Sequence, residues 1–184
     1  MENAGETIVG ECLRWVNGCN FVDYNIKTGK KQGEIDVIGL NFSQKRAYVC
    51  EVATHMQTGL NYVDPKTGES DNVNRFLKKF SKDIEYARGA FPGYGLTFML
   101  WVPLVKINQT GMVNQQRDIE SIVSSVKSSH AADIKVVSNL EYYSYLEKLV
   151  AVARKEKKEM MSPIMRFLQV HQKLKKYLTY HKKL

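Results

Sequence analysis

The sequence predicts an α/β domain in which a mixed β-sheet is flanked by helices. Segments with helical and strand periodicity follow one another as one helix, three strands, helix, strand, helix, strand and two final helices. The first three strands are joined by short turns, as in an antiparallel meander, whereas helices separate the later strands, as in parallel crossovers. The length of 184 residues is sufficient for one domain with its own core.

The N-terminal third contains one helix and three strands. Residues 3–17 carry an apolar stripe at helical spacing, which predicts the first helix. Apolar runs bounded by turn residues predict strands over 20–27, 34–40 and 46–53. The polar turn NFSQK joins the last two strands into a hairpin, and a four-residue loop over 42–45 would pair Asn41 with Arg46.

The remaining elements follow a turn-rich stretch. Apolar residues at i, i+3, i+4 and i+7 predict a helix over 72–88. Residues 96–105 are apolar on both faces and predict a central strand, with Pro103 marking its end. We further expect a helix over 114–129, a strand over 133–138, a helix over 140–158, and a last helix from Ser162 and Pro163 to about residue 182.

The formal charge of +8 belongs to one segment of the chain. Residues 154–184 hold ten Lys or Arg and two Asp or Glu, whereas residues 1–153 hold seventeen of each sign. We therefore divide the chain into a core, 1–153, and a basic helical segment, 154–184. The last helix has an apolar stripe that would dock on the core or on a second subunit. Lys173 and Lys176 would then remain exposed and bind a polyanion. Binding to a membrane surface and a purely solubilising lysine face are the alternatives.

Composition excludes several classes of protein. No apolar run approaches the ~20 residues that span a bilayer, and the first residues lack the pattern of a signal peptide. The three cysteines, Cys12, Cys19 and Cys50, are an odd number without a CxxC pair. A reducing intracellular compartment, the cytoplasm, is therefore expected.

Two acids inside apolar strands are the strongest candidates for a site. With the four-residue hairpin loop, Asp36 lies directly opposite Glu51, and cross-strand Cβ atoms are ~5 Å apart. Two carboxylates that close repel each other unless a proton or cation lies between them, and hard oxygen ligands suit Mg²⁺. The alternative is an exposed edge of an ordinary hairpin. Asp is depleted in strands, and both acids interrupt strongly apolar runs, IDVI and VCEV.

The segment GEIDVIG, a short turn and then YVCEV resemble the core of the PD-(D/E)xK nuclease superfamily, especially restriction endonucleases and Holliday-junction resolvases. The resemblance implies a restriction-endonuclease-like fold with Mg²⁺ as cofactor and Mn²⁺ as a substitute. It implies that Asp36, Glu51 and the backbone carbonyl of Val52 ligate the metal ion. It also implies that Glu11, on the leading helix, holds a metal-bound water or supports the ligands.

One position departs from the family pattern. The lysine expected two residues after the glutamate is Ala53. Three readings stay open: an engineered lysine-to-alanine change, a lysine role transferred elsewhere, or a catalytically silent relative that only binds. For a transferred role, His55 continues the strand face, and Arg75, Lys79 and Lys82 lie on one side of the next helix.

The resemblance therefore implies a metal-dependent endonuclease that hydrolyses phosphodiester bonds of double-stranded or branched DNA. Lys27, Lys30 and Lys31 lie at the turn before GEID, where a phosphate backbone would approach. Paired cuts on a two-fold symmetric duplex would favour a homodimer. The alternative is a non-catalytic nucleic-acid-binding protein on the same fold.

Overall fold

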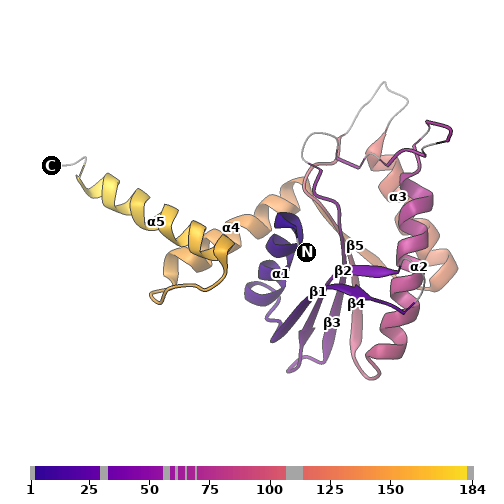
Figure 1. The fold of residues 1–184 in the computed structure, drawn as a ribbon, viewed down its shortest axis with the longest axis horizontal. Helices are drawn as coiled ribbons and strands as arrows, with labels where there is room; N and C mark the ends of the chain where they lie inside the picture. Colours follow the sequence, from indigo (N-terminus) through magenta and orange to yellow (C-terminus); the bar gives the residue numbers. More distant parts are fainter. Residues whose placement is uncertain are drawn as a thin grey trace.

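The computed structural model describes residues 3–29, 33–55, 59–60, 62–64, 66–68, 70–106 and 114–181. It is an α/β structure with a five-stranded mixed sheet and flanking helices (Figure 1). The described elements are α1 Ala4–Trp15, β1 Phe21–Lys27, β2 Glu34–Asn41, β3 Arg46–Val52, α2 Asn72–Ala90, β4 Gly95–Val102, α3 Gln115–His130, β5 Ile134–Ser138, α4 Asn139–Lys155 and α5 Pro163–His181.

The strands lie in the sheet in the order in which they occur along the chain, β1-β2-β3-β4-β5. The pairs β1/β2 and β2/β3 are antiparallel, and the pairs β3/β4 and β4/β5 are parallel. The predicted meander followed by crossover units is confirmed. β4 ends at Val102, directly before Pro103, as expected from the missing backbone donor of proline.

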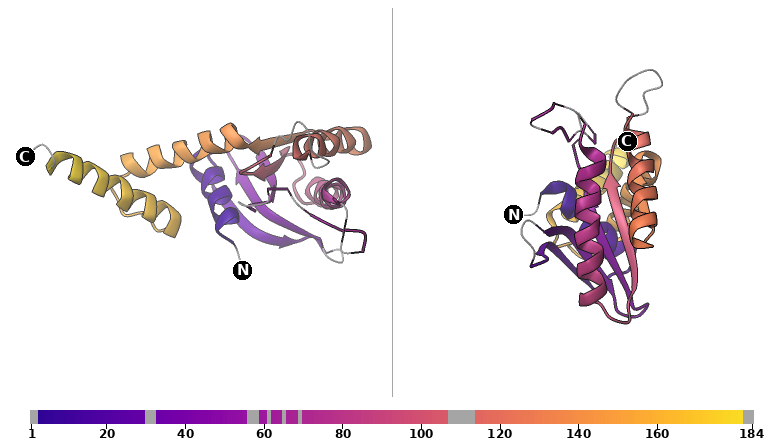
Figure 2. Two further views of the ribbon diagram at one scale, coloured as in Figure 1. Left: turned by 90° about the horizontal axis from the view of Figure 1, so that it is seen from above. Right: turned by 90° about the vertical axis from the view of Figure 1, so that its right-hand side faces the viewer.

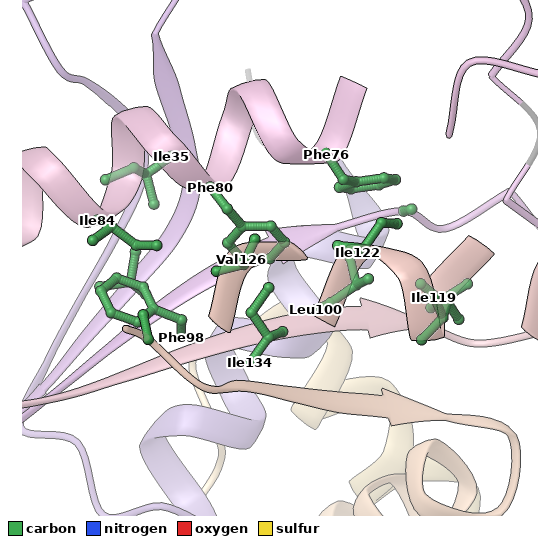
Figure 3. Packing of buried hydrophobic residues seen from close by; sticks show 14 of the residues in the cluster. Ile35, Phe76, Phe80, Ile84, Phe98, Leu100, Ile119, Ile122, Val126 and Ile134 are labelled. Carbon is green, nitrogen blue, oxygen red and sulfur yellow. The ribbon is translucent and has the colours of Figure 1, made fainter. Parts of the chain in front are cut away.

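Helices cover both faces of the sheet (Figures 1 and 2). α2 and α3 pack on one face, where Phe76, Phe80 and Ile84 of α2 meet Phe98 and Leu100 of β4 in a continuous apolar core (Figure 3). α1 and α4 pack on the other face against a second core. Because side chains alternate along a strand, each strand contributes to both cores.

The C-terminal segment is joined to the core at its start and projects from it at its end (Figure 1). α4 runs through residue 153, where we placed the boundary, and Met160 and Met165 are buried in the α1/α4 core. Farther along α5, Phe167 and Leu174 expose 69% and 55% of their surface. Of the predicted apolar stripe, Leu168 packs against this core, whereas Phe167, also in the first turns of the helix, does not. No helix in the described part of the chain is long and apolar enough to span a bilayer.

Candidate functional site

The β2/β3 hairpin has the predicted register. Asn41 is paired with Arg46 and Val37 with Cys50, so continuing the ladder by one residue brings Asp36 opposite Glu51. Val49 and Ala53 belong to the core under α2, and Cys50 belongs to the opposite core. Strand alternation therefore directs Glu51, between Val49 and Ala53, toward α2.

Asp36 is fixed by the backbone of the neighbouring strand. Its Oδ2 accepts a hydrogen bond of 2.7 Å from the amide of Val52, just beyond the last ladder pair. The carboxylate thus satisfies a backbone donor where the two strands separate. The Asp36 side chain keeps 15% of its surface exposed, so this end of the hairpin is accessible to a ligand.

Lys79 of α2 reaches across to both acids. Its ammonium forms an ion pair with Glu51 and lies 3.4 Å from Oδ1 of Asp36. Burial alone would lower the pKa of Lys79, but the carboxylates of Glu51 and Asp36 together raise it above its usual value. Phe76 and Asp83 share this helix face at i−3 and i+4, so the packing of α2 on the sheet is what delivers the lysine.

Glu51 is completely buried, with an exposed fraction of 0%. Burial and the nearby Asp36 carboxylate raise its pKa well above the usual value, and Lys79 lowers it only in part. No described donor reaches Glu51 Oε1. A fully buried carboxylate oxygen without a donor is costly, so this atom has the chemistry of a ligand for a cation or a proton.

Asp83 is a third acid in the cluster, and sequence reasoning missed it. It is 1% exposed, and burial raises its pKa to about 7, although the neighbouring Glu51 and the charge of Lys79 both lower it. The helix pattern offered one signal, since Asp83 lies four residues after Lys79 among the core-facing positions of α2.

The lysine that contacts the two acids comes from α2 and not from position 53, directly after β3. Ala53 is buried at 1% exposure in the apolar core, where its small side chain leaves room for the helix. Of the candidates for a transferred role, Lys79 contacts both acids. His55 is exposed and meets the ring of Tyr62 edge-on, at a centroid distance of 5.9 Å.

The structure does not bring Glu11 to this cluster. α1 packs on the face of the sheet opposite α2, and Glu11 Oε2 accepts a 2.8 Å hydrogen bond from the indole of Trp15. Glu11 lines a cavity of about 300 Å³ together with residues of the C-terminal segment, among them Met160 and Met165. Its helix position near the apolar stripe is thus explained by packing between α1 and the chain around α5.

Glu6 is the other buried acid of α1. It lies in the first turn of the helix, near the end of β3. Its carboxylate closes a capping box with Asn3 and accepts a 3.2 Å hydrogen bond from Asn25. Gly5 beside it lies so close to Thr54 that an added Cβ would overlap the threonine side chain. The spacing Asn-x-x-Glu at the start of an apolar stripe is the sequence signal for this cap.

Those predicted polyanion-binding lysines that the structure describes do not lie around the cluster. Lys27 is exposed at the end of β1, opposite Glu34 in the register. Lys173 and Lys176 are exposed and line a groove of about 520 Å³ on α5, which packs against α4 and α1 rather than α2. Lys30 and Lys31 lie outside the described residues.

The residues present fit a cation in part. Asp36 and Glu51 offer hard oxygen ligands, and the orphaned Glu51 Oε1 is an acceptor without a donor. No group of three or more Asp, Glu, His or Cys side chains within the described ranges is placed to hold a metal ion, so the protein ligands would be this pair with a backbone carbonyl.

Comparison with known protein families, with curated proteins and with solved structures finds no match to this chain.

Proposed function

We propose that the protein is a Mg²⁺-dependent endonuclease of the restriction-endonuclease-like type that hydrolyses DNA phosphodiester bonds. The observation that carries the proposal is the constellation of Asp36, Glu51 and Lys79 at the end of a hairpin. Two carboxylates and one lysine are the groups that the PD-(D/E)xK resemblance requires. Here the lysine comes from α2 and still contacts both acids.

Each residue has a definite role in this mechanism. Asp36, Glu51 and the carbonyl of Val52 would hold Mg²⁺, which, when bound, activates water and stabilises the charge on the leaving oxygen. Lys79 orients the attacking water and balances negative charge at the phosphorus. An electrostatic group of this kind is typically worth ~10²–10³ in rate. Glu51 is completely buried, so the packing around it limits the positions that its carboxylate can take.

Cleavage of supercoiled plasmid in Mg²⁺ or Mn²⁺ tests the proposal. We expect nicking by the wild-type chain, none by Asp36→Asn or Glu51→Gln, and a rate ~10²–10³ lower for Lys79→Met. Lys78→Met, which removes a neighbouring exposed lysine, is the matched control and should cleave normally. Absence of cleavage by the wild-type chain with either metal ion would overturn the enzyme proposal.

A non-catalytic nucleic-acid-binding protein is the second candidate. One observation favours it: the Lys79 ammonium already pairs with both carboxylates, so the cluster is satisfied in part as an internal salt bridge. On this alternative, the wild-type chain binds DNA equally well in EDTA and in Mg²⁺. Fluorescence anisotropy beside the plasmid assay separates the candidates, because metal-stimulated binding with cleavage supports the enzyme alone.

A further inference from the structure

A second cation lies beside the cluster, and its charge is not balanced. Arg75 is exposed, and its guanidinium carbon lies 4.1 Å from the centroid of the Tyr62 ring. No acid in the described part of the chain forms an ion pair with Arg75. Stacking on a ring holds the planar guanidinium in place while its N–H donors stay free for an acceptor.

The ring that supports Arg75 is itself held by a buried residue. The Tyr62 amide donates to Oδ1 of Asn72 at 2.8 Å, and the Tyr62 carbonyl accepts from the Asp71 amide, also at 2.8 Å. Asn72 is 1% exposed. The Tyr62 ring also packs edge-on against Phe76, with centroids 5.6 Å apart. The ring on which Arg75 stacks is therefore held in place by hydrogen bonds and by packing against Phe76.

Arg75 and Lys79 are one helical turn apart on α2, about 6 Å along its axis. Tyr62 is close enough to contribute to the raised pKa of Lys79, after the larger effects of burial, Glu51 and Asp36. The charge of Lys79 is balanced by two carboxylates, whereas that of Arg75 has no acidic partner among the described residues. For an anionic ligand that approaches Asp36 and Glu51, Arg75 is therefore the neighbouring cation whose charge is not balanced.

We propose that Arg75, stacked on Tyr62, binds a non-reacting phosphate of the DNA strand next to the phosphate that is cleaved. The inference rests on the proposed function and names how the site positions its substrate. A guanidinium binds two phosphate oxygens with parallel hydrogen bonds, so the fixed fork sets the register of the strand on Asp36 and Glu51. Arg75 is a positioning residue in this scheme, whereas Lys79 acts at the reacting phosphorus.

Salt-dependent binding gives the first test. Anisotropy of a labelled duplex in EDTA measures the slope of log affinity against log salt, which falls by about 0.9 for each lost phosphate contact. We expect Arg75→Gln to lower the slope by this amount and to weaken binding about tenfold. Lys78→Gln removes the same charge from an exposed neighbour and should leave the slope unchanged. Tyr62→Phe keeps the ring and should bind normally, whereas Tyr62→Leu should resemble Arg75→Gln.

A modified substrate gives the second test. A single uncharged methylphosphonate in a duplex should suppress wild-type cleavage at one bond a fixed distance away. Arg75→Gln should show no such suppression, because this variant already lacks the contact with the phosphate that the methylphosphonate replaces. An unchanged salt slope, or the same suppression in both proteins, would overturn the role of Arg75. Wild-type protein that neither binds nor cleaves DNA would instead overturn the proposed function, so the two failures are distinguishable.

Discussion

Replacing Lys79 with methionine tests whether its ammonium stabilises the fold by balancing the charges of Glu51 and Asp36. Methionine keeps much of the apolar stem and removes the ammonium. Glu51, with none of its surface exposed, then loses the cation that lowers its pKa. Removing one partner of a buried ion pair costs about 3–5 kcal/mol, and the lower end applies here because Lys79 keeps 31% of its side chain exposed. That loss is a large part of the ~5–15 kcal/mol that holds a domain folded.

The pH dependence of this loss has a definite sign. The folded-state pKa of Glu51 is already raised by burial, and removing Lys79 raises it further. The folded protein then binds more protons than the unfolded chain, whose glutamate titrates near 4.5. Stability therefore falls as pH rises above that value. We expect the deficit of Lys79→Met to be about 3 kcal/mol at pH 8 and clearly smaller at pH 5.

Urea unfolding of three variants measures the effect. Lys78→Met alters an exposed neighbour and should change the unfolding free energy by less than ~0.5 kcal/mol. The double variant Glu51→Gln with Lys79→Met removes both charges and should recover part of the loss. A deficit for Lys79→Met no larger than that for Lys78→Met, or one that is equal at pH 5 and pH 8, would refute the reasoning.

Three further outcomes are expected. Ala53→Lys in the Lys79→Met background returns the lysine to the strand, and plasmid cleavage should rise above that of Lys79→Met alone; no gain would argue against an equivalent position. Burial raises the pKa of Asp83 from 3.8 in the unfolded chain to about 7 in the folded protein. The folded protein therefore loses stability as the pH rises from about 3.8 to about 7, by at most ~1.4 kcal/mol per pH unit. Asp83→Asn should flatten that decline in urea titrations between pH 4 and 8, and a wild-type slope in the variant would contradict this. On α5, Met165→Ala should cost ~2–5 kcal/mol by thermal or urea unfolding, whereas Phe167→Ala, 69% exposed, should cost under ~0.5, and equal costs would contradict the observed docking.

The hairpin shows what sequence reasoning captured. Turn length and strand alternation fix which residues face one another, so the pairing of Asn41 with Arg46 and the approach of Asp36 to Glu51 followed from local rules. The order of strands and helices followed from periodicity and from the length of the connections. These features depend on residues close together in the chain.

The completion of the cluster depends on residues far apart in the chain. Lys79 lies 28 residues after Glu51, and only the packing of Phe76 and Phe80 on the sheet selects it over Arg75 or Lys82. Glu11 shows the reverse case. Its position near an apolar stripe was compatible with either face of the sheet, and the helix that carries it lies on the face away from α2. Periodicity identifies a buried side of a helix but not the surface that buries it.

The lysine on α2 makes the centre dependent on helix docking. A lysine on β3 would stand beside Glu51 as soon as the hairpin forms, because all three groups would lie within one local unit. Here the hairpin alone presents two acids without a cation, and α2 must pack before the third group arrives. Local opening of α2 thus dismantles the whole constellation while leaving the sheet paired. On the proposed function, a partly folded chain would lack the complete site, because the contacts that complete the native core also bring Lys79 to the two acids.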